Sequence, residues 1–410
     1  MLKIKDIKVK RVSIPHSETV VMAENKGGYD HITTLVIQLE TDEGIVGVSE
    51  MPGWHGPDRW EFEIENVLKP QLIGEDPFNI ERIVGTRYFM THDAAAEHAQ
   101  VSGPFLIASI EIACWDIIGK ASKLPVYKLM GGRLWEKIPI TRFIGIRSPE
   151  EAARDSLAAV KEGIKAIKLK VGLDPQQDIA IVKAVRDAVG DDIAIRVDAN
   201  QAWSVGTAIN QINKMARYYP QYVEGPIPAW DWDGFLRIRR RTQVPLCVCE
   251  TLHIEGYLAA ILRLIQKQAV DFVSTDPWRT AGLLGFKKLC AICDAADIPV
   301  VMHWNTLGVS QAACLHACES NHATLYPQDI LCINLKPGPV DDIVTRPLRH
   351  ERGYLKVPEG HGLGVDLDEK KLELWSKYDE KIRKEPAKMT PAERFGDENL
   401  PVTYYFPPRY

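Results

Sequence analysis

Acidic residues recur at an equal spacing in the middle of the chain. Asp198, Glu224, Glu250 and Asp276 are each 26 residues apart, and His303 follows Asp276 after 27 residues. Each of them stands at the end of a short apolar run. This spacing accommodates one strand, one helix and their connections, so it predicts four acids and a histidine at the ends of successive strands. One such acid alone is typical of a surface salt bridge, whereas the series indicates a shared site.

Three carboxylates on neighbouring strands would form an oxygen-rich metal site. Mg²⁺ prefers oxygen ligands in octahedral geometry and keeps part of its water shell. We therefore predict Mg²⁺ as the cofactor, with Asp198, Glu224 and Glu250 as its ligands. A zinc hydrolase is a weaker alternative, because the strand ends offer carboxylates rather than clustered histidines.

A pair of lysines precedes these acids. Lys168 and Lys170 lie on the same side of one predicted strand, because side chains alternate along a strand. A lysine acts as a base only when neutral, and a second ammonium group with a divalent cation nearby favours the neutral amine. A Lys-x-Lys pair alone is commonplace, but here Lys170 is a candidate base. Asp276 and His303 offer a second one, since a carboxylate can fix the imidazole tautomer and raise its basicity.

The elements that must position these residues alternate regularly from about residue 136. Short β-rich runs are followed by helical patterns, such as 149–162 and 177–189, which predicts a parallel sheet covered by helices. Seven or eight such units in about 200 residues indicate a closed eight-fold barrel, with its active site at the C-terminal ends of the strands. The predicted strands are 138–146, 166–171, 193–198, 222–225, 246–250, 270–276, 300–303 and 324–329.

A different pattern precedes the barrel. Residues 1–50 alternate as three strands, at 4–12, 33–40 and 44–50, and residues 57–130 are helical in pattern. We therefore predict an α+β domain over 1–135 and a barrel domain over 136–368. The tail over 369–410 is charged and then rich in proline and tyrosine, and we expect it to pack on the first domain.

Composition excludes several classes of partner. A chain of 410 residues exceeds the size of one compact core, which agrees with two domains. The charge of −5 is spread along the chain, and the dense basic run at 237–241 fits a solvated helix face, so we expect no nucleic-acid partner. No apolar run is long enough to cross a membrane, and the first residues alternate like a strand rather than a signal peptide.

The cysteines predict a reducing compartment. All eight lie mostly in apolar segments of a large chain without a signal peptide, which indicates reduced core thiols and the cytoplasm. Cys290 and Cys293, with Cys314, His316 and Cys318, also raise a zinc hypothesis. Both segments have the pattern of amphipathic helices, however, where cysteines usually pack.

The lysine pair, the acids and the histidine resemble those of the enolase superfamily, in its mandelate racemase-like branch. The resemblance covers nearly the whole chain and includes Gly47-Val-Ser-Glu50, Ala113-Cys-Trp-Asp116, Leu129-Met-Gly-Gly132 and Gly362-Leu-Gly-Val-Asp366. It implies a modified (β/α)₇β barrel under an α+β capping domain, and a homo-oligomer. It also implies that Mg²⁺ binds a substrate carboxylate, that Lys168 helps neutralise that carboxylate, and that Lys170 and His303 face opposite sides of the substrate.

Within this branch the chain is most similar to glucarate dehydratase-like proteins. These carry an asparagine two residues after the catalytic histidine, as Asn305 does here. The chain departs from them at Glu250, where they have asparagine, and it lacks a match to the histidine and tyrosine that grip the distal carboxylate. Phe143 stands about where that tyrosine would be. The candidate substrate contacts are Asn200, Asn305, Phe143, Asp329, His31 and Trp54.

These residues lead to one main hypothesis and two alternatives. The main one is acid-sugar dehydration, in which Lys170 or His303 removes the proton next to the carboxylate and His303 helps to expel the β-hydroxyl. The product is a 2-keto-3-deoxy acid. The first alternative is a racemase or epimerase that uses the same two bases. The second is a catalytically silent relative that acts as a binding protein, and this would predict a decayed site.

Overall fold

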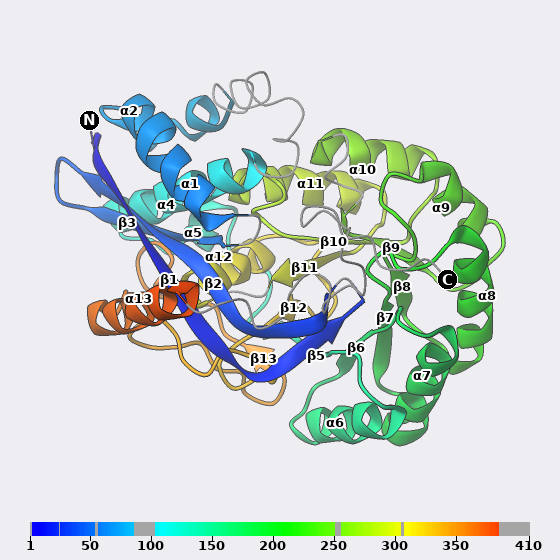
Figure 1. Cartoon of the computed structure of the whole chain (residues 1–410). Coiled ribbons are helices and arrows are strands. Elements are labelled where there is room, and N and C mark those ends of the chain that lie inside the picture. The colour runs from blue at the N-terminus through cyan, green and yellow to red at the C-terminus, as the bar shows by residue number, and fades with distance from the viewer. Residues whose placement is uncertain are drawn as a thin grey trace.

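The chain begins with an antiparallel sheet of three strands, β1 (Ile4–Met22), β2 (Asn25–Thr41) and β3 (Val46–Pro52), in the order β1-β2-β3. It is seen in a computed structural model that describes residues 2–23, 25–53, 56–85, 103–250, 256–304 and 307–384. β1 and β2 are longer than predicted because they continue to pair with each other as a ribbon as far as Met22 and Asn25. Figure 1 shows this sheet, in blue, beside the barrel.

Helices cover this sheet. They are α1 (Pro57–Glu63), a π-helical turn (Ile64–Leu68), α2 (Lys69–Leu72), α4 (Gly103–Ser122) and α5 (Val126–Leu129). α4 packs closely on β3, where a side chain at Gly47 would collide with the carbonyl oxygen of Ala113. The first motif of the family resemblance therefore contains a glycine that lets a helix and a strand approach.

The second part of the chain is an eight-stranded parallel barrel, as the alternation predicted. Each strand is bonded to its sequence neighbour, and a bridge between Ile140 and Gln328 lies where the last strand meets the first. The strands are β5 (Thr141–Ile144), β6 (Ala166–Lys170), β7 (Ala194–Asp198), β8 (Tyr222–Glu224), β9 (Leu246–Val248), β10 (Phe272–Thr275), β11 (Val300–Trp304) and β12 (Asp329–Ile330).

In the described residues a helix follows each of the first seven strands, which confirms a (β/α)₇β barrel. Figure 1 shows these helices around the strands, from α6 in green to α12 in yellow. They are α6 (Pro149–Lys161), α7 (Pro175–Val189), α8 (Val205–Met215), α9 (Trp232–Arg239), α10 (Tyr257–Gln266), α11 (Leu283–Ala295) and α12 (Gly308–Glu319). Local sequence explains where two of these helices begin. Ser148 and Glu151 form a capping box on α6, and Asp174 caps α7.

The prediction for the last barrel strand was wrong. The strand lies at Asp329–Ile330 rather than at 324–329. The hydroxyl of Thr324 instead donates to the carbonyl oxygens of Cys318 and Asn321, at 2.9 and 2.7 Å, and so closes the end of α12. Threonine has a high strand propensity, but here its side chain bonds to the preceding helix.

The tail begins with a helix, α13 (Glu369–Lys384), after the short β13 (Tyr354–Leu355), which pairs with β4 (Ile138–Pro139). α13 lies against β1 (Figure 1), and Asp379 accepts a hydrogen bond from Ser13 Oγ at 2.8 Å. This contact joins the described part of the tail to the first sheet. Residues 385–410 lie outside the described residues.

The cysteines do not form the zinc site that their spacing suggested. All eight are free and buried. His316 Nδ1 accepts from the Tyr127 backbone N–H at 3.3 Å, and its Nε2 lies 3.1 Å from the Leu363 carbonyl oxygen. Burial lowers the pKa of His316 to about 4. In the described part of the chain Cys290, Cys293, Cys314, Cys318 and His316 form no group with metal-ligand spacing.

Buried acids join the two domains. Glu50 on β3 accepts hydrogen bonds from the backbone N–H groups of Leu307 and Ser310 at the start of α12, at 3.1 and 3.0 Å. Glu111 on α4 accepts from Leu283 and Leu284 at the start of α11, at 2.8 and 3.0 Å. Both side chains are fully buried and satisfy free backbone N–H groups at the start of a barrel helix. The first domain is therefore fixed to the two helices that follow β10 and β11.

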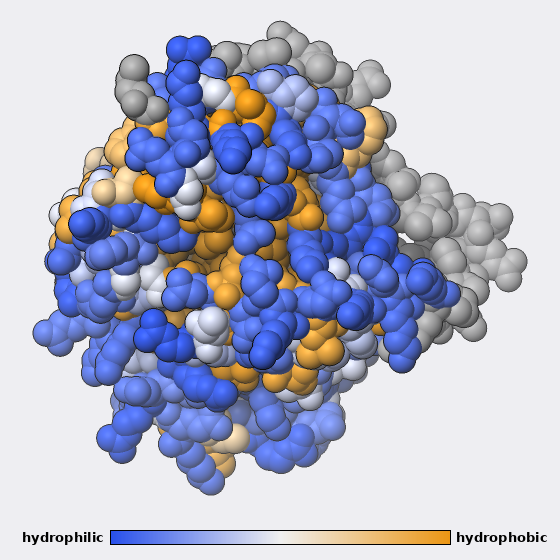
Figure 2. Space-filling view, turned by 90° about the vertical axis from the view of Figure 1, so that its left-hand side faces the viewer, coloured by the Kyte–Doolittle hydropathy of each residue, from blue (hydrophilic) through white to orange (hydrophobic). Residues whose placement is uncertain are grey.

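The surface on the side of the first domain carries an apolar band between hydrophilic residues (Figure 2). Single exposed apolar side chains are ordinary on soluble proteins. The homo-oligomer stays a prediction. Among the described residues, no helix is both long and apolar enough to span a bilayer. The cytoplasmic location stays a prediction.

Glu50 makes stability depend on pH. Burial, with the charge of Asp342, raises its pKa in the folded chain from 4.5 to about 8. Between these two pKa values the folded chain keeps the carboxyl proton of Glu50, whereas the unfolded chain has lost it. The stability that this proton contributes is complete below the unfolded-state pKa and is lost as pH rises through the folded-state pKa. Between about pH 5 and pH 8, we expect the free energy of unfolding to fall more steeply for the wild type than for Glu50→Gln.

Chemical denaturation at a series of pH values measures this difference. Glu43→Gln, in the exposed turn between β2 and β3, is the control and should keep the wild-type slope. Equal slopes for the wild type and Glu50→Gln would contradict the expectation.

Candidate active site

The register of the barrel strands brings predicted site residues to one level. Lys170 on β6 is paired with Asp198 on β7, and Asp198 is paired with Glu224 on β8. All three side chains are buried. They lie at the C-terminal ends of parallel strands, where barrel enzymes hold their catalytic groups.

Glu250 adds a third carboxylate. It follows β9 and lies beside Gly225, whose φ of +48° is in the left-handed region that favours glycine. A Cβ atom at Gly225 would stand 3.2 Å from Glu250 Oε2. A larger residue there would therefore press on this carboxylate.

The three carboxylates are close enough to influence one another. Burial raises the pKa of Glu224 to about 7; Lys168 opposes this rise, and Asp198 and Glu250 add to it. Burial, followed by the charge of Asp198, also raises the pKa of Glu250. Buried acids that repel one another are stabilised by a divalent cation, and carboxylate oxygens are the ligands that Mg²⁺ prefers. The donor types of these residues therefore fit Mg²⁺, but their ligand atoms do not form a group within 4.8 Å of one another in the described part of the chain.

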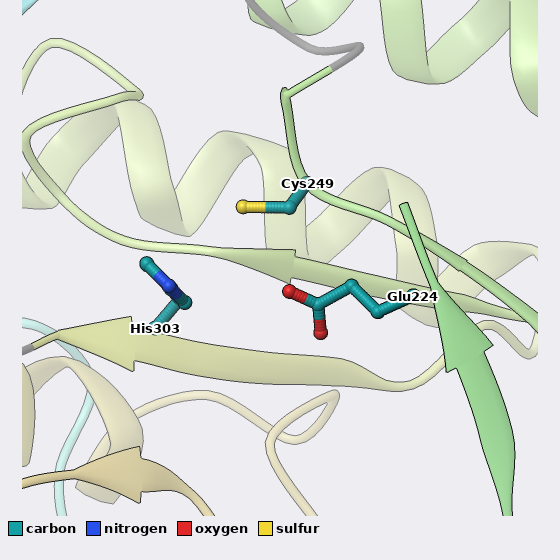
Figure 3. A group of neighbouring side chains, drawn as sticks. All are labelled: Glu224, Cys249 and His303. Carbon is teal, nitrogen blue, oxygen red and sulfur yellow. The ribbon is translucent and has the colours of Figure 1, made fainter. Parts of the chain in front are cut away.

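A second donor group includes a residue that sequence reasoning missed. Ligand atoms of Glu224, Cys249 and His303 all lie within 4.8 Å of one another, and no other such group of three occurs in the described residues. Figure 3 shows the three side chains pointing toward one another, from β8, the segment after β9, and β11. Thiol and imidazole ligands favour softer metals than Mg²⁺. Cys249 directly precedes Glu250, and that position was its only signal in the sequence.

Lys168 is paired with three buried acids of the site. Its ammonium group lies 2.8 Å from Glu224 Oε2, 3.4 Å from Asp198 Oδ2 and 3.0 Å from Asp329 Oδ2. Burial alone would lower the pKa of Lys168, but Asp329, Glu224 and Asp198 together raise it well above its ordinary value. Lys168 is therefore a permanent positive charge, suited to attract a carboxylate and not to act as a base.

Asp329 contacts Lys168, and both of its carboxylate oxygens have a partner. Its Oδ2 atom binds Lys168, and its Oδ1 atom accepts a hydrogen bond from Arg196 Nη1 at 2.9 Å. Arg196 is fully buried and also stands over the ring of Tyr222, with 5.1 Å between the guanidinium carbon and the ring centre. Asp329 was predicted to contact substrate. In the structure its two carboxylate oxygens bind Lys168 and Arg196.

Lys170, the predicted base, is paired with two polar side chains at the end of β7 and just after it. Its Nζ atom lies 2.6 Å from Asp198 Oδ2 and 2.6 Å from Asn200 Oδ1. Both contacts are hydrogen bonds that Lys170 donates, one of them to a predicted metal ligand. Asn200 adopts a positive φ of 43°, and the ring centre of Phe143 lies 5.3 Å from Lys170 Nζ. Asn200 and Phe143 therefore adjoin the candidate base.

Arg279 stands between Asp276 and His303, and sequence reasoning missed it. Its Nη1 atom is bonded to Asp276 Oδ2 and also lies 3.1 Å from His303 Nδ1. His303 Nδ1 and Asp276 Oδ2 are 4.0 Å apart, too far for a hydrogen bond. The direct carboxylate–imidazole contact that the spacing suggested is thus replaced by a contact through Arg279. In the sequence, the only indication of this contact is that Arg279 follows Asp276 by three residues.

Electrostatics keep His303 neutral. Burial, followed by the charges of Arg279, Lys168 and Lys170, lowers the pKa of His303 well below its ordinary value. The ring is accordingly one N–H donor and one acceptor at physiological pH.

Three other residues were predicted to contact substrate. His31 lies on β2, and its Nδ1 atom is 2.6 Å from Asp30 Oδ1. Trp54 and Asn305 lie outside the described residues.

Comparison with known proteins covers both parts of the chain. A family model described as "Enolase C-terminal domain-like" matches residues 151–371. Another, described as "Mandelate racemase / muconate lactonizing enzyme, N-terminal domain", matches residues 6–131. The two matches follow the division into barrel and capping sheet.

Three curated relatives differ in the reaction that their names describe. The chain is 29% identical to an N-succinyl-L-Arg/Lys racemase of Bacillus cereus, over 93% of this chain and 100% of the relative. It is 31% identical to a hydrophobic dipeptide epimerase of Enterococcus faecalis, over 89% and 99%. It is 30% identical to an arabinonate dehydratase of Saccharolobus solfataricus, over 83% and 90%.

Two of these proteins also resemble it in structure. The B. cereus racemase superposes with a TM-score of 0.81 at 27% identity, covering 91% of this chain and 98% of its own. The E. faecalis epimerase, whose structure contains Mg and a dipeptide, superposes with a TM-score of 0.76 at 27% identity, covering 89% and 99%.

The two donor groups make different predictions for metal binding. If the carboxylates are the ligands, Glu250→Gln should weaken Mg²⁺ binding by roughly tenfold or more, because an amide supplies no negative charge. Cys249→Ser and the surface variant Glu162→Gln should leave it unchanged. Calorimetric titration with Mg²⁺ measures all three. A loss of affinity in Cys249→Ser with none in Glu250→Gln would contradict the carboxylate site.

Proposed function

Because the chain belongs to the mandelate racemase/muconate lactonizing enzyme family of the enolase superfamily, as its motifs predicted, we propose that it is a Mg²⁺-dependent acid-sugar dehydratase. The observation that carries this proposal is the placement of two different proton-transfer groups around the carboxylates. Lys170 lies on β6 and His303 on β11, with β12 and β5 between them on one side and β7 to β10 on the other. One group is a lysine paired with Asp198 and Asn200, and the other is a histidine that is held neutral.

Asp198, Glu224 and Glu250 would hold the metal. When bound, Mg²⁺ supplies positive charge for the substrate carboxylate and for the negative charge that develops on it. Lys168 adds a second fixed positive charge at the same place. Fixed charges in a buried site cost no reorganisation during the reaction and stabilise charge more strongly than water does.

The side chains of this site can carry the two proton transfers. Lys170 takes the proton from the carbon next to the carboxylate, and the electron pair of that C–H bond forms a carbon–carbon double bond. The C–O bond to the β-hydroxyl breaks, and His303 gives the proton with which the hydroxyl leaves as water. The enol that remains rearranges to a 2-keto-3-deoxy acid. Lys170 then releases its proton to solvent, and His303 regains one.

The substrate class rests on two supports. One relative that matches across most of the chain is an arabinonate dehydratase, and another is a probable glucarate dehydratase. The resemblance of the histidine region to glucarate dehydratase-like proteins points to the same class. Phe143, however, adjoins Lys170 as an apolar face. It offers a distal carboxylate no hydrogen bond, so a monoacid sugar fits this position better than a diacid.

Proton transfer without elimination is the second candidate. A racemase and an epimerase are among the relatives, at 29% and 31% identity. Such a reaction requires His303 to accept a proton on one face of the substrate and Lys170 to return one on the other. The same residues and metal would serve, and the substrate would need no β-hydroxyl.

Incubation in D₂O separates the two reactions. The Mg²⁺-loaded protein is given a library of mono- and diacid sugars, with N-succinyl amino acids and dipeptides added as epimerase substrates. Dehydration produces a 2-keto acid, which a carbonyl reagent detects. Lys170→Ala or His303→Asn should slow it by about 10²- to 10⁴-fold.

Mass spectrometry measures deuterium in the recovered acids. Deuterium without keto acid would contradict dehydration and favour the epimerase. Neither product from any acid would contradict both functions. Glu162→Gln, at the opposite end of the barrel, is the control and should keep wild-type rates.

A further inference from the structure

We propose that Arg279 sets the tautomer of His303, so that the imidazole faces the substrate with an N–H group and acts as an acid rather than a base. The contact that carries this inference is between Arg279 Nη1 and His303 Nδ1, at 3.1 Å. It goes beyond the family's general scheme because it concerns which ring nitrogen bears the proton.

The direction of this hydrogen bond is fixed by chemistry. A guanidinium group has five N–H donors and no acceptor. His303 Nδ1 must therefore accept, which requires a lone pair on that nitrogen. In a neutral imidazole the single proton then resides on Nε2, at the edge of the ring away from Arg279. A protonated ring would carry N–H on both nitrogens and would oppose the contact.

Arg279 is well held in this position. Its backbone N–H donates to Asp276 Oδ1 at 2.9 Å, and its Nη1 atom is bonded to Asp276 Oδ2. Arg279 is only 9% exposed, and Asp276 is fully buried. Its guanidinium carbon also lies 5.8 Å from the ring centre of Phe105, on α4 of the capping domain. A buried ion pair and an aromatic face thus restrict the guanidinium group to one orientation.

Asp276 alone would have the opposite effect. A carboxylate accepts hydrogen bonds, so a direct contact would place the proton on His303 Nδ1 and leave a lone pair on Nε2, which is the arrangement of a base. The observed separation of 4.0 Å shows that Asp276 acts on Arg279 instead. Arg279 is therefore a positioning residue that reverses what the acid would do to the histidine.

The reversal suits elimination, and in this respect the inference rests on the proposed function. As the C–O bond breaks, the Nε2–H bond breaks as well, and the proton joins the departing hydroxyl to form water. The ring is left with a negative charge, which the Arg279 guanidinium neutralises through Nδ1. A neutral histidine is known to act as an electrophile in this way. Lys170 is then the only one of the two groups that can remove the α-proton.

Nitrogen NMR of histidine-labelled protein tests the tautomer directly and needs no substrate. The Mg²⁺-loaded full chain is labelled with ¹⁵N at both ring nitrogens, and His303 is assigned by the signals that His303→Asn lacks. We expect neutral His303 with its proton on Nε2 in the wild type. In Arg279→Met the proton should move to Nδ1, because Asp276 becomes the partner. Arg147→Met, an arginine of another ion pair, is the control and should not change it.

Two results would overturn the inference. One is a wild-type His303 that carries its proton on Nδ1 or on both nitrogens, and this result does not depend on whether any variant folds. The other is an Arg279→Met protein, folded by circular dichroism, in which the proton stays on Nε2.

Product analysis tests the catalytic consequence separately. Arg279→Met should lose keto-acid formation by about 10²-fold or more, while exchange of the α-proton with D₂O falls less, because Lys170 is untouched. Equal losses of both would overturn the acid role. A wild type with the expected tautomer but without any keto acid would overturn the proposed dehydration and, with it, the acid role, and would leave the effect of Arg279 on the tautomer standing.

Discussion

A charge inside a protein must be paired, and the ammonium group of Lys168 shows how this barrel meets that constraint. Lys168 is 2% exposed and touches Asp198, Glu224 and Asp329. Lys168 and these three acids are therefore a single electrostatic unit.

The capping domain also contributes buried acidic side chains that contact the barrel. Glu50 and Glu111 each place a buried carboxylate at the positive end of a barrel helix, α12 and α11. These helices follow β11 and β10, the strands that carry or precede His303 and Asp276. The first domain therefore contacts the barrel through buried hydrogen bonds at the starts of two of its helices, and not through apolar packing alone.

Much of the fold could be predicted from sequence because its signals are local. Alternation of apolar residues revealed the strands, and the repeated spacing of Asp198, Glu224 and Glu250 followed from the length of one strand–helix unit. Strand pairing then placed Lys170 beside Asp198 and Asp198 beside Glu224, as successive strand ends require. The last strand was misplaced because Thr324 bonds to the end of α12, a contact that propensity does not reveal.

The sequence by itself determined the barrel, the family and the residue types at its strand ends, because these depend on periodicity and on spacing within one repeat. Only the tertiary structure decided how those side chains pair. It placed Arg279 between Asp276 and His303, used Asp329 to hold Lys168, and brought Cys249 near Glu224 and His303. Such contacts depend on rotamers and on strands far apart in the chain, where differences of a few ångströms decide which partner a charged group meets.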